Sequence, residues 1–142
     1  MDESLMIIDD MNKYSFDKVF MDSNNYLIIN DTLLLPDTVG VDSVKTIWTA
    51  HRLSLKDYAK DRNIQSIALD KFKNLMIISN NKRIIKEQNS YFFNEGGWID
   101  SDFGKVFSKS KIEDKEKDFK FDRVQEIKAI LDKPNWYEYY AD

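Results

Sequence analysis

The feature that most constrains the fold is the series of short β-rich runs between residues 64 and 93. These runs are separated by asparagine-containing turns of hairpin length, and they cover residues 66–70, 75–79, 83–88 and 90–93. Short β-rich runs joined by such turns are typical of a β-meander, and asparagine tolerates the positive φ angles that tight turns need. We therefore predict an α+β fold built on a central antiparallel β-meander sheet, with the rest of the chain packed on one of its faces.

Two to three helices are predicted to pack on this sheet. Apolar residues at roughly helical spacing predict a helix or two short helical turns within 2–21. A near-perfect capping box predicts a further helix over 55–61. Residues 26–30 and 32–35 are expected to add two strands. The predicted core, taken from alternation in the strands and from the helical period, consists of Ile67, Leu69, Leu75, Ile77, Ile84, Phe92, Val124, Ile127 and Leu131.

The C-terminal part predicts one more helix and an aromatic tail. Apolar residues from Phe121 to Leu131 recur at steps of three and four, so an amphipathic helix is expected over 122–132. The alternating charges of 109–120 indicate a solvated linker or the exposed start of that helix. The tail 134–142 is rich in tryptophan and tyrosine, and it either packs on the sheet or exposes an aromatic patch to a partner.

The composition is that of a small folded domain. A chain of 142 residues fits one domain with its own core, and a hydrophobic share of 42% excludes a disordered chain. The absence of cysteine excludes disulfides and thiolate sites. Acidic residues follow Met1 where a secretory signal would carry positive charge, and the longest apolar runs are too short to span a bilayer. We therefore expect a single domain over 1–142 and a cytoplasmic location.

Charge is distributed unevenly along the chain, whose formal net charge is −4. Residues 51–86 carry nine lysines and arginines against three acidic residues, whereas residues 1–50 carry three against nine and residues 87–142 carry nine against thirteen. A basic centre between acidic flanks fits a polyanion-binding face, an acidic face for a basic partner, or two regions that neutralise each other in the fold.

Residues able to carry catalysis are few. His51 is the only histidine, and neither a nucleophile elbow nor a phosphate-binding loop occurs. The run from Asp100 to Gly104 begins like a calcium loop, but its glycine comes one position early and Lys111 stands where a bidentate glutamate belongs. We therefore predict a protein that is not an enzyme and that holds neither a metal ion nor a cofactor.

The prediction that fits these observations is a protein-binding module. A small acidic domain rich in aromatic residues has the composition of an interface in which aromatic anchors are surrounded by charge. Bacterial immunity proteins and phage-encoded inhibitors share this description. We therefore predict a stoichiometric inhibitor, or an immunity- or antitoxin-type protein, that neutralises a basic partner such as a toxin or defence protein. The predicted contacts lie on or beside an expected loop at 95–98 and in the aromatic tail: Trp98, Asp100, Asp102, Trp136, Tyr137 and Tyr140.

Nucleic-acid binding is the alternative prediction. Residues 55–72 can be threaded as a helix-turn-helix, with Asn63 at the turn and Phe72 inside the second helix. The same residues cannot form both this second helix and the strands of the meander. On either reading, a regulator would meet phosphates through basic side chains between residues 52 and 86, chiefly Arg52, Lys56, Lys60, Arg62, Lys71 and Lys73.

Overall fold

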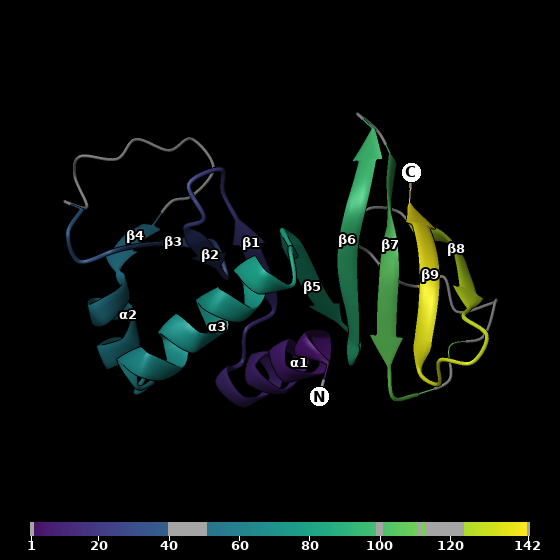
Figure 1. Cartoon of the computed structure of the whole chain (residues 1–142), viewed down its shortest axis with the longest axis horizontal. Helices are drawn as coiled ribbons and strands as arrows, with labels where there is room; N and C mark the ends of the chain where they lie inside the picture. Colours follow the sequence, from purple (N-terminus) through teal and green to yellow (C-terminus); the bar gives the residue numbers. More distant parts are fainter. Residues whose placement is uncertain (1, 40–50, 99–100, 111, 113–123, 142) are drawn as a thin grey trace. The chain divides into compact units, whose positions relative to one another are not determined.

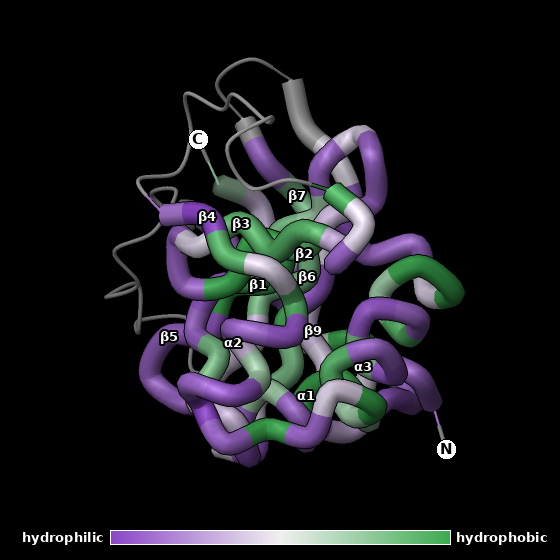
Figure 2. Tube along the Cα trace, turned by 90° about the vertical axis from the view of Figure 1, so that its left-hand side faces the viewer, coloured by the Kyte–Doolittle hydropathy of each residue, from purple (hydrophilic) through white to green (hydrophobic). Residues whose placement is uncertain are grey.

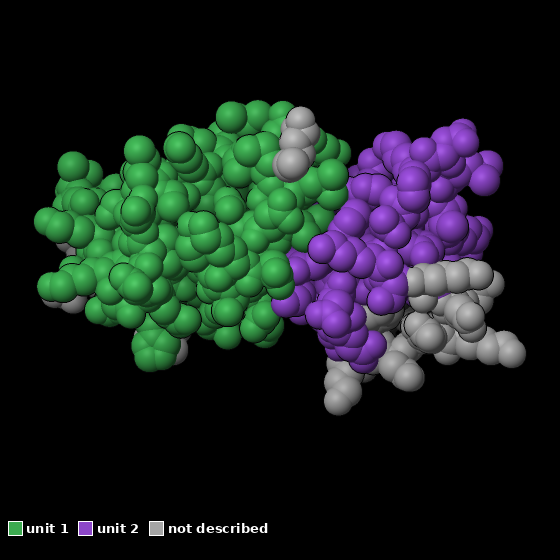
Figure 3. Space-filling view, turned by 90° about the horizontal axis from the view of Figure 1, so that it is seen from below, with its two compact units in different colours: residues 1–82 green, residues 83–142 purple. Residues whose placement is uncertain are grey.

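The computed structural model describes residues 2–39, 51–98, 101–110, 112 and 124–141 (Figure 1). The chain divides into two compact units, unit 1 over residues 1–82 and unit 2 over residues 83–142 (Figure 3). Both helices and antiparallel strands are present, so the mixed α+β fold class is confirmed. None of the described helices is long and apolar enough to cross a membrane. The expectation of one domain over the whole chain stays a prediction.

In its described part, unit 1 consists of three helices and a four-stranded sheet. The sheet has the order β4-β3-β2-β1, in which β1, β2 and β3 pair antiparallel and β4 runs parallel to β3. Residues along β2 and β3 are largely hydrophobic (Figure 2). The elements in chain order are α1 (Glu3–Tyr14), β1 (Lys18–Met21), β2 (Leu27–Ile29), β3 (Thr32–Leu35), β4 (His51–Ser54), α2 (Leu55–Asp61) and α3 (Ser66–Ile78).

Helix α1 is bounded by two residues suited to its ends. The Asp2 side chain accepts a hydrogen bond of 2.9 Å from the backbone N–H of Ser4 and so caps the first turn. Ser15, with a φ of 59°, adopts the left-handed conformation that ends many helices. The helix predicted within 2–21 is thus confirmed in its first part. The last residues of that range form β1 instead, because the helix has already ended.

The largest correction to the predicted fold concerns α3. Residues 66–78 form one helix, so the first two strands predicted for the meander are wrong. Leu69, Phe72 and Met76 recur at steps of three and four residues and are buried, and the helix contacts both α1 and α2. Short apolar runs satisfy the strand and the helix patterns equally well. This segment forms a helix because its buried helical face packs against two other helices.

The helix also changes which residues of this segment belong to the core. Leu69 is buried as predicted and Leu75 is half-buried. Ile67 and Ile77 were predicted to be buried, but both are exposed, and 62% of the surface of Ile67 is accessible. Asn63, with a φ of 55°, forms the turn that precedes the helix. Residues 55–72 thus form a helix, a turn and the start of a second helix, and nucleic-acid binding by them stays a prediction.

Unit 2, in its described part, is an antiparallel sheet with the strand order β5-β6-β7-β9-β8. Gln88 and Asn89, both with positive φ, form the two-residue hairpin between β5 and β6. Ile84 and Phe92 are buried as predicted. The strands are β5 (Arg83–Glu87), β6 (Ser90–Trp98), β7 (Ser101–Ser108), β8 (Val124–Ala129) and β9 (Trp136–Ala141).

The predicted C-terminal amphipathic helix is wrong, because residues 124–129 form strand β8. Ile127 is buried in a cluster with Tyr137 of β9. Leu131, predicted to be in the core, is 89% exposed, and the side chain of Val124 lies outside the described part of the chain. The apolar period was regular, but the segment pairs with the tail that follows it across residues 130–135. A local period does not reveal such a partner.

The aromatic tail forms β9, which lies between β7 and β8. Tyr137 and Tyr139 are buried on one side of the sheet, whereas Tyr140 on the other side is exposed. Tyr137 and Tyr139 thus pack as the first interpretation expects, and contact between the exposed Tyr140 and a partner stays a prediction. The linker predicted at 109–120 falls largely outside the described residues.

Candidate functional site

Of the two acidic residues predicted as contacts, Asp102 lies within the described part of the chain. Asp102 lies in β7, where its Oδ2 is 2.9 Å from Nη1 of Arg83 and both side chains are half-buried. Asp100 and the side chain of Trp98 lie outside the described residues. Residues 95–98 belong to β6, so the loop expected there is wrong. Because Arg83 already neutralises Asp102, this carboxylate attracts a basic partner only weakly.

The three predicted aromatic contacts have different surroundings, although all lie on β9. Tyr137 is buried, and its hydroxyl accepts a hydrogen bond of 3.1 Å from the backbone N–H of Ile112. Trp136 is half-buried, and its ring centroid lies 5.6 Å from that of Phe93 and 5.2 Å from that of Phe107. Tyr140 alone is an exposed large hydrophobic residue, with 42% of its surface accessible. Only Tyr140 of the three is therefore available to a partner.

Strand register places Tyr140 within a defined group of exposed side chains. Phe103 of β7, Tyr140 of β9 and Glu126 of β8 lie opposite one another across the three strands. Two residues along, Lys105, Glu138 and Lys128 form a second row. Side chains directly opposite each other, or two residues apart along a strand, point to the same side of a sheet. We call the surface formed by these six residues the β7–β9–β8 face.

Two large aromatic residues are exposed in the first row of this face. Phe103 is 49% exposed, and its partner across the strands is Tyr140. On β6, Gly96 lies opposite Phe103. A Cβ atom added at Gly96 would lie 3.0 Å from Cζ of Phe103, so the ring extends across the glycine. The missing side chain at Gly96 thus provides the space that the ring occupies.

The charged residues of the β7–β9–β8 face are only partly paired. Lys128 Nζ lies 2.9 Å from Glu126 Oε1, and Lys105 Nζ lies 3.3 Å from Glu95 Oε1. The hydrogen bond with Glu126 raises the pKa of Lys128, and the charge of Glu138 adds to this. Glu138 lies opposite both lysines in register, yet it forms no ion pair within the described part of the chain.

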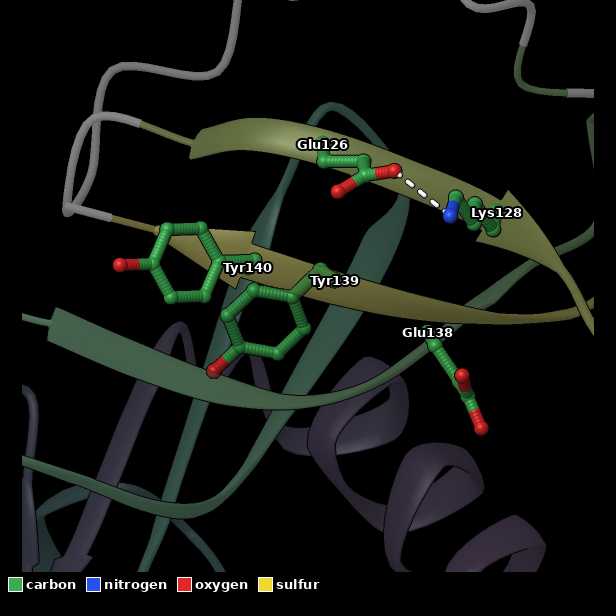
Figure 4. Close-up of a pocket in the computed structure, with 5 residues that line it drawn as sticks. All are labelled: Glu126, Lys128, Glu138, Tyr139 and Tyr140. Atoms are coloured by element: carbon green, nitrogen blue, oxygen red, sulfur yellow. Dashed lines mark ion pairs between the residues drawn. The ribbon is translucent and has the colours of Figure 1, made fainter.

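A shallow hollow of about 170 Å³ opens between β8 and β9 on this side of unit 2. Figure 4 shows the ion pair of Glu126 and Lys128 along β8, with Tyr140 and Glu138 on either side of Tyr139 along β9. These five residues line the hollow. It therefore combines two carboxylates, one ammonium group and an accessible aromatic ring.

Known proteins do not supply an interpretation of this face. No family model, curated protein or solved structure matches the chain. Among the described residues, no three histidine or carboxylate side chains gather in a way that could hold a metal ion. His51 is exposed in β4. The function has to be inferred from the chemistry of the chain's own surfaces.

Sequence reasoning missed most of the β7–β9–β8 face. Of its six residues, only Tyr140 was predicted as a contact. The missed signal is strict alternation: Phe103 and Lys105 share one side of β7, just as Glu138 and Tyr140 share one side of β9. This alternation was present in the sequence, but the pairing of β7 with β9 and of β9 with β8 was not visible locally.

The alternative site is formed by α2 and α3 of unit 1. Tyr58 and Ala59 of α2, Ile64 of the turn and Phe72 of α3 are buried. The Tyr58 hydroxyl is buried without a hydrogen-bond partner among the described residues, and burial raises the pKa of this hydroxyl, opposed in part by the charge of Arg62. The two helices thus enclose a small apolar core. Their outer surfaces remain available for binding.

The six predicted basic residues differ in their exposure and in their contacts with aromatic rings. Lys56, Lys60, Arg62 and Lys71 are exposed, whereas Arg52 and Lys73 are half-buried. Two of the cations lie over aromatic rings: the Arg62 guanidinium is 5.4 Å from the Tyr58 ring centroid, and Lys73 Nζ is 5.8 Å from that of Tyr26. Acidic residues are interspersed with them, because Asp57, Asp61 and Asp70 of the same helices are also exposed. The helix pair is therefore basic only in part.

Proposed function

We propose that this chain is a non-catalytic protein-binding module. It acts as a stoichiometric inhibitor, or as an immunity- or antitoxin-type protein, and neutralises a basic partner such as a toxin or defence protein. The observation that carries the proposal is the pair formed by Phe103 and Tyr140, which lie opposite each other on adjacent strands with 49% and 42% of their surfaces accessible. Aromatic residues surrounded by charged ones are the usual anchors of protein interfaces.

The surroundings of this pair favour a partner with basic side chains. Glu126 and Glu138 lie next to Tyr140 in the register of the sheet. Lys128 is bound to Glu126, so Glu138 is the carboxylate of this face that lacks an ion pair in the described structure. An incoming cation would find its counter-charge there, on the strand that also carries Tyr140.

Capture of the partner tests the proposal. We expect the tagged chain to recover one protein in near-equal amount from a lysate of its source organism, whether or not the lysate is treated with nuclease. Replacing Phe103 and Tyr140 by serine should lower this recovery at least about tenfold, because two anchor residues are truncated. Mass spectrometry of the eluates measures the recovery. Unchanged recovery with a folded double variant would remove this face from consideration.

A matched control separates the site from general surface hydrophobicity. Ile67 and Ile78 are exposed apolar residues on α3. Replacing both by serine removes a comparable amount of exposed apolar surface from unit 1. Recovery of the partner should stay within about twofold of the original chain, because surface substitutions away from an interface have small effects. A loss equal to that of the Phe103 and Tyr140 variant would mean that non-specific adhesion produces the capture.

Nucleic-acid binding is retained as a second candidate because one observation favours it. Helices α2 and α3 follow each other across residues 62–65, and Tyr58, Ala59 and Phe72 lie on their buried sides. Exposed lysines lie on both helices, among them Lys56, Lys60 and Lys71. Phosphate contacts made by these lysines would be independent of the β7–β9–β8 face.

A salt series tests this candidate. If α2 contacts duplex phosphates, log affinity should fall linearly with log salt concentration, and replacing Lys56 and Lys60 by glutamine should reduce the slope by about two. Replacing the exposed Lys18 and Lys133 by glutamine removes the same charge from residues outside α2 and α3 and should leave the slope unchanged. Fluorescence anisotropy with a labelled duplex measures both. Absence of binding at low salt, or equal slopes for the two double variants, excludes the helix pair as the contact.

A further inference from the structure

The proposed function does not say which chemical group of the partner the hollow between β8 and β9 would bind. The lining of this hollow carries two carboxylates, from Glu126 and Glu138, and one ammonium group, from Lys128. The exposed ring of Tyr140 lies at the other end of the lining from Lys128 and Glu138 (Figure 4). The lining therefore carries one more negative than positive charge, and a single cation would balance it.

We infer that this hollow receives one arginine side chain of the protein partner. The inference rests on the proposed function and names the group that the partner supplies. An arginine guanidinium stacks on aromatic rings and donates paired hydrogen bonds to carboxylates, and it is less strongly hydrated than a lysine ammonium. Tyr140 offers the ring, and Glu138 offers a carboxylate without an ion pair in the described structure. An uncharged side chain would leave this carboxylate unbalanced.

Lys128 acts as an internal competitor for the incoming cation. Its ammonium group lies 2.9 Å from Glu126 Oε1, and the side chains of the two residues are 73% and 54% exposed. An ion pair exposed to this extent contributes little to stability, so a stronger cation displaces it at small cost. Removing Lys128 leaves both carboxylates to the ligand. Arginine binding should therefore become tighter in its absence.

The experiment uses a small probe in place of the partner. Nα-acetyl-arginine amide is titrated into the full chain, and the backbone and tyrosine-ring resonances of β8 and β9 are followed by NMR. The amide of acetylated citrulline, which keeps the shape of arginine but carries no charge, is the matched ligand. We expect millimolar binding of the arginine probe with shifts centred on Tyr140, and at least about threefold weaker binding of the citrulline probe. Equal affinity for both probes, or shifts confined to other strands, would overturn the inference.

Two variants test the assigned roles, each with a control of equal charge. Glu138→Gln should weaken the arginine probe by about two- to fivefold, the range expected for one exposed ion pair, whereas Asp37→Asn, on an exposed residue of unit 1, should not. Lys128→Gln should tighten binding by a similar factor, whereas Lys18→Gln should not. Equal effects in variant and control would mean that net charge alone attracts the probe, and the hollow would no longer be a site.

The outcome is separable from that of the partner capture. If Phe103 and Tyr140 are needed to recover a partner but the arginine probe does not bind, the proposed function stands and the inference about arginine falls. If the probe binds in the predicted order across the variants but no partner depends on Phe103 and Tyr140, the site for a cationic side chain stands and the proposed function falls.

Discussion

Replacing Gly104 by alanine is expected to unfold unit 2 or to lower its free energy of unfolding by about 3 to 5 kcal/mol. A Cβ atom at Gly104 would clash with the backbone carbonyl oxygen of Phe93, and it would lie 3.0 Å from the backbone nitrogen of Glu95. Both atoms belong to β6, the neighbouring strand, so no side-chain rotation relieves the contact. Urea unfolding followed by tryptophan fluorescence measures the change. A Trp48→Phe background leaves Trp98 and Trp136, both in strands of unit 2, as the reporters.

Gly96→Ala is the matched control for this substitution. Its Cβ would approach only the ring of Phe103, at 3.0 Å, and that ring is the far end of an exposed side chain. The ring moves aside, so we expect a change of no more than about 1 kcal/mol in the free energy of unfolding. A Gly104→Ala chain with an unfolding midpoint equal to that of Gly96→Ala would contradict the close approach of β6 and β7 at this position.

The elements predicted correctly from the sequence are those with local signals. Helix α2 begins after Ser54, whose hydroxyl accepts a hydrogen bond of 3.1 Å from the Asp57 N–H, as the capping pattern predicted. Strands β2 and β3 follow the two short apolar runs around Asn30 and Asp31, both of which adopt positive φ. In these segments the residues that determine the conformation are next to each other in the chain. Their interpretation required no knowledge of the rest of the fold.

The errors have the opposite character, because contacts with other helices and strands determine the structure there. Residues 66–70 and 75–79 were assigned to strands on their alternating pattern, but packing against α1 and α2 makes 66–78 a helix. Residues 124–129 have a helical apolar period, yet they pair with β9 in a sheet, and Leu131 is exposed to solvent. Tertiary contacts override local patterns when both periods fit a short run.

In the candidate site, too, the sequence predicted only what has a local signal. Tyr140 was predicted because an aromatic tail is visible in the sequence. Phe103, Glu126 and Glu138 were not, because their importance depends on the register that places them beside Tyr140. Asp102 was predicted as a contact, but Arg83, nineteen residues away, neutralises it. Residue type alone thus indicated an aromatic and acidic surface, and register determined which residues form it.

Replacing Phe72 by alanine is expected to lower the free energy of unfolding of unit 1 by about 3 to 5 kcal/mol. Phe72 is fully buried on α3, and its ring centroid lies 5.3 Å from that of Phe16 in an edge-to-face arrangement. The substitution loses the buried area of the ring and leaves a cavity between packed elements. Urea unfolding followed by far-ultraviolet circular dichroism measures it, because all the described helices belong to unit 1.

The size of this loss decides between the two interpretations of the segment. If residues 71–74 formed a turn between strands, Phe72 would be exposed and its truncation would change the free energy of unfolding by less than about 0.5 kcal/mol. Lys71→Ala, on the exposed neighbour, should show such a small change in the helix. A Phe16→Ala and Phe72→Ala double-mutant cycle should give a coupling of about 0.5 to 1.5 kcal/mol, since the two rings pack directly. Equal, small effects of Phe72→Ala and Lys71→Ala would contradict helix α3.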